Sequence, residues 1–223
     1  SSAFRMDPEV PLVVPEVNPQ AILKHKGIIA NPNCSTIIMV MALKPIYDLA
    51  KIKRVIVSTY QAVSGAGKEG IDELDAQVRE HSEGREMTAN ILPFASAEKH
   101  YPIAFNLIPQ IDVFCDNLYT KEEMKMVNET KKIMEDYEMR ITATTIRVPV
   151  YRSHSESVNI ELEKEVDLGA MREALAKFPG VTVQDDPSKQ EYPMPLYTSE
   201  KDDVYVGRLR RDESCEKSYN MWV

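Results

Sequence analysis

The stretch GIIANPNCST (residues 27–36), followed by the apolar run IIMVMAL (residues 37–43), decides how the rest of the chain is organised. Residues 28–30 are predicted to end a buried strand, residues 31–33 to form a tight turn, and residues 35–50 to form a helix. The first turn of this helix begins at Cys34. The pattern therefore predicts a strand, a turn and a helix, with a thiol at the helix N-terminus.

A cysteine in this position is suited to acyl chemistry. The unpaired N–H groups and the dipole of a helix N-terminus favour a thiolate, and the same groups can stabilise an oxyanion on a bound carbonyl. The alternative is a small buried residue, which is what most free cysteines are. Cys115 continues a strand-like pattern and Cys215 lies in a polar run, so we interpret both as structural or incidental.

The composition is ordinary for a folded domain, with 223 residues, 43% hydrophobic and 28% charged. The net charge of −8 argues against general binding to nucleic acids or anionic membranes. Three widely spaced cysteines give neither a disulfide framework nor paired metal ligands. We therefore expect no metal, and a cytoplasmic protein with no membrane-spanning segment.

Because the sequence lacks an initial Met and stops within an apparent strand, we expect it to be a piece of a longer chain.

Alternating and helical patterns place the remaining elements. Residues 1–26 are proline-rich and are predicted to form an extended connector, and Pro45 to kink or end the first helix. Thr120 and Glu123 form a predicted capping box. Strands are predicted at residues 54–59, 104–114, 140–150, 157–162, 204–209 and 219–223, and helices at residues 68–81, 120–137 and 166–177. Residues 181–203 are predicted to be loop-rich.

The segment GAGKEG (residues 65–70) matches the spacing of a dinucleotide-binding glycine loop. In that fold, the following helix leads into a second hydrophobic strand that ends in an acidic residue. The sequence continues instead with the polar run SEGREM (residues 82–87). We therefore do not interpret this loop as a dinucleotide fingerprint.

Only four histidines are available as proton donor and acceptor for a thiolate nucleophile. His25, His81 and His100 lie in charged or polar contexts typical of surface residues. His154 lies between two predicted core strands, in the turn RSHSE (residues 152–156). It is the best candidate for the acid and base, with a structural histidine as the alternative.

Three motifs in order resemble those of the aspartate-semialdehyde dehydrogenase family. They are NPNCST (residues 31–36), YQAVSGAG (residues 60–67) and RVPVYRSH (residues 147–154). The resemblance covers nearly the whole chain, from residue 1 to about Trp222. With the pattern of elements, it predicts an α+β fold in which helices pack on a mixed sheet. This fold is similar to the C-terminal domain of enzymes like glyceraldehyde-3-phosphate dehydrogenase, and we expect residues 1–223 to form a single catalytic and dimerisation domain.

The resemblance implies NADPH-dependent reductive dephosphorylation of L-4-aspartyl phosphate to L-aspartate 4-semialdehyde, in the biosynthesis of lysine, threonine, methionine and diaminopimelate. It also implies a role for each site residue. Cys34 is the nucleophile, His154 the acid and base, and Gln61 orients the substrate. Arg147 holds the α-carboxylate, which suits a bidentate guanidinium. Glu122 reaches the substrate amino group, Lys125 and Arg5 contact phosphate, and the backbone at Asn33 and Cys34 stabilises the oxyanion.

From spacing alone, Glu122 and Lys125 are simply three residues apart on one helix face, which is typical of a solvated pair. The resemblance further implies that Ser64, Gly65, Ala66 and Gly67 approach NADP. We expect the cofactor to be bound mainly by a domain absent from this chain, so that residues 1–223 alone are inactive. A homodimer or homotetramer is expected.

Two other functional classes remain open. Cys34, His154 and Asn159 follow the order of a papain-like cysteine hydrolase, although the residues flanking Cys34 do not match that family. The chain could also be a catalytically silent dimerisation module, because it shows no dinucleotide fold of its own.

Overall fold

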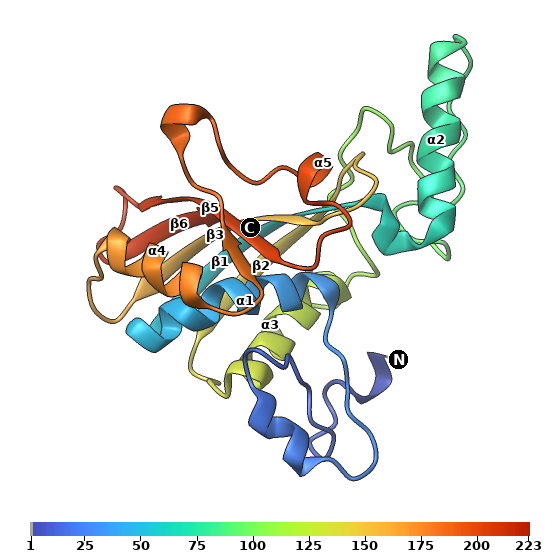
Figure 1. Ribbon diagram of the computed structural model, residues 1–223. Helices are drawn as coiled ribbons and strands as arrows, with labels where there is room; N and C mark the ends of the chain where they lie inside the picture. The colour runs from blue at the N-terminus through green and yellow to red at the C-terminus, as the bar shows by residue number, and fades with distance from the viewer. Residues whose placement is uncertain (1) are drawn as a thin grey trace.

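The computed structural model describes residues 2–223, and Ser1 of the expected connector lies outside them. A six-stranded mixed sheet carries helices on it (Figure 1), which confirms the predicted α+β class. The strands are β1 (Ile52–Gln61), β2 (Arg140–Arg147), β3 (Ser155–Leu162), β4 (Val181–Val183), β5 (Val204–Arg211) and β6 (Ser218–Trp222). The helices are α1 (Cys34–Leu49), α2 (Lys68–Ser82), α3 (Lys121–Met134), α4 (Leu168–Lys177) and the short α5 (Pro195–Thr198).

The strand order is β2-β1-β3-β6-β5-β4. Strand β1 runs parallel to β2 and antiparallel to β3, and its register places Gln61 beside Arg147 at the end of both strands. Beyond that end, the N–H of Val63 donates to Val150 O and the N–H of Ser64 to Tyr151 O. These bonds bring the loop after β1 against the loop that leads from β2 to His154.

The main core lies between one face of the sheet and helices α1, α3 and α4. From Val55 to Gln61 of β1 every second residue is buried, which is the pattern of a strand with one face against a core. Met171 and Leu175 of α4 are fully buried against it, as their spacing predicts. Helix α2 instead projects away from the sheet (Figure 1), and a small second core packs at its base, including Leu74, Leu92 and Ile103.

Several predicted elements are wrong. Residues 28–30 do not form a buried strand, since Ile28 and Ile29 are exposed and only Ala30 makes an isolated bridge, to Leu12. Residues 104–114 are not a strand but a loop with two isolated bridges. Their apolar pattern arises partly because Ala104 and Ile108 pack in the second core. Strand β4 and helix α5 were not predicted, although the rest of residues 181–203 is largely irregular, as expected.

Pro45 neither ends α1 nor forms its boundary, because the helix continues to Leu49. A proline inside a helix removes one hydrogen bond and costs about 3 kcal/mol. In α1 this cost is offset by burial, since Leu43, Pro45 and Ile46 all lie in the protein interior. Tertiary packing therefore overrides the local signal.

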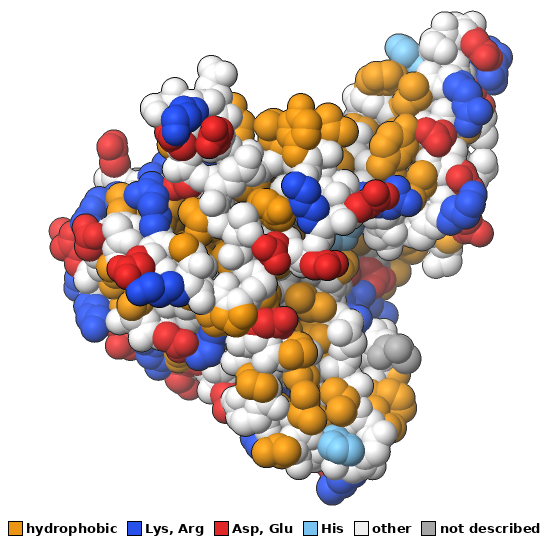
Figure 2. Space-filling model, in the orientation of Figure 1, with side chains coloured by type: hydrophobic (Ala, Val, Ile, Leu, Met, Phe, Trp, Pro, Cys, Tyr) orange, Lys and Arg blue, Asp and Glu red, His pale blue; other side chains and the backbone are white. Residues whose placement is uncertain are grey.

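The N-terminal segment folds over α3 rather than running only as an extended connector. It includes two short 3-10 helices, η1 (Ser2–Phe4) and η2 (Pro19–Lys24). Val10, Leu12 and Val14 belong to the main core. Figure 2 shows hydrophobic side chains on the surface of this segment, and the exposed ones include Leu23 and Ile28.

No helix within residues 2–223 is both long enough and apolar enough to cross a membrane.

The capping box that begins α3 is confirmed and extends to the sheet. The Thr120 hydroxyl accepts from the Glu123 N–H at 3.2 Å, and the Thr120 N–H donates to Glu123 Oε2 at 2.7 Å. Glu123 Oε1 also accepts from the N–H of Thr145 on β2, at 3.0 Å. One buried carboxylate therefore fixes both the start of α3 and its position on β2.

We predict that Thr120→Ala lowers the free energy of unfolding by about 1 kcal/mol, the usual effect of losing an N-cap. Glu123→Ala should cost more, roughly 2–5 kcal/mol, because it leaves two buried N–H donors without an acceptor. Urea unfolding of the chain measures both, with Lys121→Ala, at an exposed position of the same turn, as the control. Equal effects of Glu123→Ala and Lys121→Ala would contradict this account.

Candidate active site

Cys34 is the first residue of α1, and the residue is exposed on one side although protein atoms surround much of its thiol. Asn33 is the N-cap, with its side-chain oxygen accepting from the Thr36 N–H at 3.2 Å. The N–H groups of Cys34 and Ser35 therefore belong to the first turn, where a helix provides no acceptor of its own. The predicted position of Cys34 at the N-terminus of a helix is therefore confirmed.

The carboxylate of Glu122 on α3 organises the residues around this turn. Its Oε1 accepts from the Asn33 side-chain amide at 2.8 Å and from the Gln61 amide at 3.3 Å. Its Oε2 pairs with Lys125 Nζ at 3.1 Å. Glu122 is only 5% exposed, so three groups from three different elements converge on one buried acceptor.

A second carboxylate of α3, Glu129, changes the expectation for the oxyanion site. Its Oε2 accepts the backbone N–H of Asn33 at 2.6 Å, and its Oε1 pairs with Arg5 Nη1 at 3.2 Å. The Asn33 N–H is therefore already donated to Glu129 and is not free for an oxyanion. This contradicts the role that the resemblance implied for the Asn33 backbone. The N–H groups of Cys34 and Ser35 are the candidates that remain in this turn.

Of the two basic residues expected to contact phosphate, Lys125 belongs to α3 and Arg5 pairs with Glu129 of the same helix. Lys125 Nζ pairs with Asp112 at 2.9 Å as well as with Glu122. Burial opposes the charge on Lys125, but these two carboxylates outweigh it and raise its pKa. Because Glu122, Lys125 and Glu129 follow a spacing of three and then four residues, they share one face of the helix.

The pKa of the Cys34 thiol is raised, not lowered as expected for a helix N-terminus. Desolvation is the largest cause, and the negative charge of Glu122 adds to it. Hydrogen bonding from Ser35 and the charge of Arg147 oppose the shift without cancelling it. In this state the site therefore holds Cys34 mainly as a neutral thiol at pH 7.

Arg147 and His154 meet at Gly65. The Arg147 Nη1 donates to Ala62 O at 2.8 Å, and its Nε is buried without a hydrogen-bond partner. A Cβ on Gly65 would lie 2.6 Å from Arg147 Nη1 and 3.2 Å from the His154 ring. A larger residue at position 65 would therefore have to displace the Arg147 guanidinium or the His154 ring, and the two side chains share one site.

The state of His154 follows from its surroundings. The Ala62 N–H donates to His154 Nδ1 at 3.0 Å, so the neutral ring carries its proton on Nε2. Burial, with the nearby charge of Arg147, lowers its pKa to about 4. Glu122 acts in the opposite direction but more weakly. At neutral pH His154 therefore presents an uncharged N–H donor.

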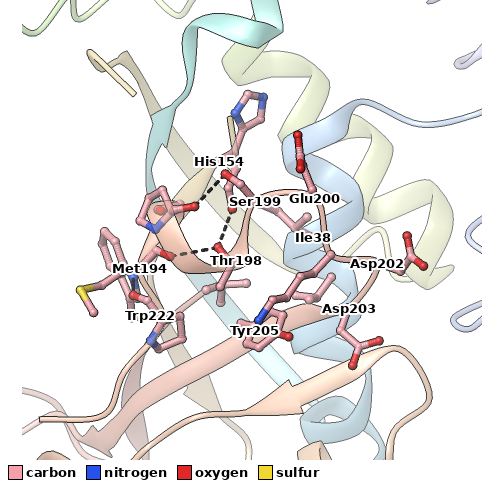
Figure 3. Close-up of a pocket in the computed structure, with 17 residues that line it drawn as sticks. Ile38, His154, Met194, Thr198, Ser199, Glu200, Asp202, Asp203, Tyr205 and Trp222 are labelled. Carbon is pink, nitrogen blue, oxygen red and sulfur yellow. Dashed lines mark hydrogen bonds between the residues drawn. The ribbon is translucent and has the colours of Figure 1, made fainter. Parts of the chain in front are cut away.

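Figure 3 shows His154 at the edge of a pocket of about 270 Å³ formed with α5 and the loop that follows it. Ser153 and Thr198 share a hydrogen bond of 2.7 Å across this pocket. Its loop also carries Glu200, Asp202 and Asp203. The histidine is thus reachable from solvent on the α5 side.

The glycine loop is not a phosphate-binding loop. The N–H groups of Val63, Ser64, Gly65 and Gly67 all donate to protein carbonyls. A loop that cradles a pyrophosphate needs these donors free. Since α2 projects away and β2 begins only at Arg140, no second strand follows directly, in agreement with the rejected fingerprint.

The other candidate residues lie elsewhere. The side-chain amide of Asn159 on β3 donates to Asn220 on β6 and to Asp212 just after β5, and so does not orient His154 as a papain-like asparagine does. Cys115 is half-buried in the loop before α3, and Cys215 is exposed beyond β5. Among residues 2–223, no three side chains of the usual ligand types gather so as to hold a metal ion.

Comparison with known proteins fits this arrangement. Residues 43–223 match the family described as "Semialdehyde dehydrogenase, dimerisation domain". The chain belongs to this family. Its aspartate-semialdehyde dehydrogenase relatives include that of Aquifex aeolicus (strain VF5), 56% identical over all of this chain and 64% of the relative. That of Bacillus subtilis (strain 168) is 52% identical over all of this chain and 65% of the relative.

The same family likeness holds for solved structures. Aspartate semialdehyde dehydrogenase II from Vibrio cholerae, solved in complex with ASA, matches with a TM-score of 0.92 and 46% identity. The match covers 99% of this chain and 64% of that one. The chain therefore spans just under two thirds of the length of the family members that it matches.

Sequence reasoning missed Asp112 and Glu129, the carboxylates that hold Lys125 and Arg5. Glu129 had a signal, because it lies seven residues after Glu122 and so two turns along the same helix face. Asp112 had none, since it reaches Lys125 from an irregular loop. Glu156 is also fully buried with no partner for either oxygen, and burial raises its pKa well above the ordinary value.

The raised pKa of Cys34 gives a direct prediction. In a Cys115→Ser/Cys215→Ser background, only Cys34 can react with iodoacetamide. Its alkylation rate should rise with pH, and the pH at which the rate is half-maximal, the midpoint, should lie above that of a free thiol. Glu122→Gln should lower the midpoint, because it removes a negative charge that disfavours the thiolate. Glu135→Gln makes the same charge change at the exposed end of α3 and should have no effect. A native midpoint below that of a free thiol would contradict the electrostatics described above.

Proposed function

We propose that this chain provides the catalytic half of an NADP-dependent aspartate-semialdehyde dehydrogenase. The observation that carries the proposal is the convergence of Asn33, Gln61 and Lys125 on Glu122, beside a thiol at a helix N-terminus. This agrees with the family membership and with the relatives' names. The reaction is the reductive dephosphorylation of L-4-aspartyl phosphate to L-aspartate 4-semialdehyde, or its reverse.

In the proposed first step, the Cys34 sulfur attacks the acyl carbon of aspartyl phosphate. The carbon–oxygen bond to phosphate breaks, phosphate leaves with the electron pair and takes up the proton that the thiol gives up, and an aspartyl thioester remains. The N–H groups of Cys34 and Ser35 are positioned to stabilise the oxyanion formed on the way. Because the pKa of the free thiol is raised, the bound substrate must assist thiol deprotonation, for example through its ammonium group where it pairs with Glu122.

The remaining roles follow from contacts of the same residues. Arg147 is proposed to bind the α-carboxylate, since its buried Nε lacks a partner and one side of its guanidinium is available for a bidentate contact. Gln61 orients the substrate from the end of β1. His154 donates from Nε2 to substrate oxygen; to act as a base there, it needs the other neutral tautomer. Arg5 and Lys125 contact the departing phosphate.

When bound, NADPH would supply the hydride that reduces the thioester, and NADP⁺ would accept a hydride when the reaction runs in reverse. Residues 64–67 do not fit its pyrophosphate, because their N–H groups are largely committed to protein carbonyls. They can lie beside only the reactive end, next to Arg147 and His154. We therefore propose that the cofactor is held mainly by residues outside this chain, and that residues 1–223 alone transfer the acyl group without completing the redox reaction.

A homodimer or homotetramer in the cytoplasm completes the proposal, with a role in making lysine, threonine, methionine and diaminopimelate. The family description as a dimerisation domain supports self-association. The loops after α2 also leave the large apolar side chains of Phe105, Leu107, Phe114 and Leu118 exposed, and covering them with a second subunit would be favourable.

Acyl transfer to this chain tests the proposed chemistry. Incubation with L-4-aspartyl phosphate should add one aspartyl group to Cys34, detected by mass spectrometry of the intact chain and removed by hydroxylamine. Cys34→Ala should abolish the adduct, and Cys215→Ala should leave it unchanged. Arg147→Gln should slow its formation at least about 100-fold, because a charge-assisted bidentate contact is lost. Labelling that persists in Cys34→Ala would refute the assignment.

A further inference from the structure

We propose that Glu129 is the positioning residue that ties Arg5, the proposed phosphate contact, to the turn carrying Cys34. The inference rests on the proposed function and extends it to a residue outside the expected site. Its basis is that the two oxygens of one buried side chain serve two segments far apart in the sequence. Oε2 accepts the Asn33 N–H at 2.6 Å, and Oε1 accepts from Arg5 at 3.2 Å.

Burial makes these contacts specific. Glu129 is 1% exposed, and the side chain of Arg5 is 18% exposed. A buried ion pair holds its geometry because breaking it leaves a charge without compensation in a medium of low polarity. An exposed pair such as Lys24 with Glu135, at the end of the same helix, has no such constraint.

The position of Arg5 is fixed from two sides. Its Nε donates to Asn31 O at 2.9 Å, so the guanidinium is held between Glu129 and the turn before Cys34. Lys132, one turn after Glu129, donates to the carbonyl oxygens of Arg5, Asp7 and Val10 at 2.8, 2.7 and 2.8 Å. Helix α3 therefore holds the backbone of this segment through Lys132 and the guanidinium through Glu129.

This arrangement leaves Arg5 able to bind an anion. A guanidinium has five N–H donors, and the contacts to Asn31 and Glu129 use two of them. Lys125 lies four residues before Glu129, on the same face of α3. Arg5 and Lys125 thus present two cations along one helix, and their spacing depends on the Glu129 contact.

A positioning role and a simple charge effect of Glu129 predict opposite changes in phosphate affinity for Glu129→Gln. Removing a negative charge beside Arg5 should strengthen phosphate binding if only charge matters. A glutamine, however, turns one acceptor oxygen into a donor that faces the Asn33 N–H or the Arg5 guanidinium. If Glu129 positions Arg5, phosphate binding therefore weakens even though the local charge has become more positive.

The test is an NMR titration of this chain with inorganic phosphate, together with hydrogen exchange of the Asn33 amide. We expect Glu129→Gln to weaken phosphate binding about tenfold and to speed exchange of the Asn33 amide at least tenfold. In Glu129→Asp the charge is kept, but the aspartate side chain is too short to reach both partners, so phosphate binding should also weaken. This variant still tests the inference if Glu129→Gln fails to fold. Glu135→Gln is the matched control, with both quantities within twofold of the native chain.

In an Arg5→Gln background, Glu129→Gln should have no further effect on phosphate affinity but should still speed exchange at Asn33. Unchanged or tighter phosphate binding in both Glu129 variants overturns the inference about Glu129. It leaves the proposed phosphate site standing, because phosphate then binds without the native Glu129 contacts. Failure of phosphate to bind the native chain overturns the proposed phosphate site and the inference with it. Unchanged exchange at Asn33 in a folded Glu129→Gln variant also overturns the inference.

Discussion

The arrangement of the site depends on one buried carboxylate, Glu122, that accepts hydrogen bonds from Asn33, Gln61 and Lys125. These donors come from the turn before α1, the end of β1, and α3 itself. A buried carboxylate must find such partners, because an unpaired buried charge is strongly unfavourable. The same requirement that satisfies Glu122 therefore brings three elements together at the thiol.

Charge balance around the thiol follows from the same contacts. Each cation near the thiol has a carboxylate partner. Arg5 pairs with Glu129 and Lys125 with Asp112. Arg147 feels the charge of Glu122. With the cations largely compensated, Cys34 and His154 are governed mainly by burial, which raises the pKa of Cys34 and lowers that of His154 to about 4. In the free state both groups are neutral at pH 7. The proposed substrate, a phosphorylated zwitterion, would bring charges that change this balance.

Local signals allowed helices α1 to α4 and most strands to be predicted. The capping box at Thr120 and the spacing of Met171 and Leu175 act within a few residues, so the sequence alone predicts α3 and α4. Errors arose where tertiary packing decides. Pro45 lies within a helix because its surroundings are buried, and Ile28 and Ile29 are exposed despite a strand-like pattern.

The candidate site shows the same division. The position of Cys34 at a helix start is a local property and was predicted. The commitment of the Asn33 N–H to Glu129 joins residues 96 positions apart, and no local pattern reports it. The raised pKa of Cys34 is equally non-local, because it arises from burial and from Glu122 on another helix. The resemblance supplied the residues of the site, while the structure supplies their partners and protonation states.

If Glu122 holds the site together, a crystal structure of Glu122→Ala will show it. We expect β1, β2 and β3 to keep their register in the variant, while the side chains of Asn33, Gln61 and Lys125 lose their common position. Those three side chains superposing on their native positions in the variant would contradict it.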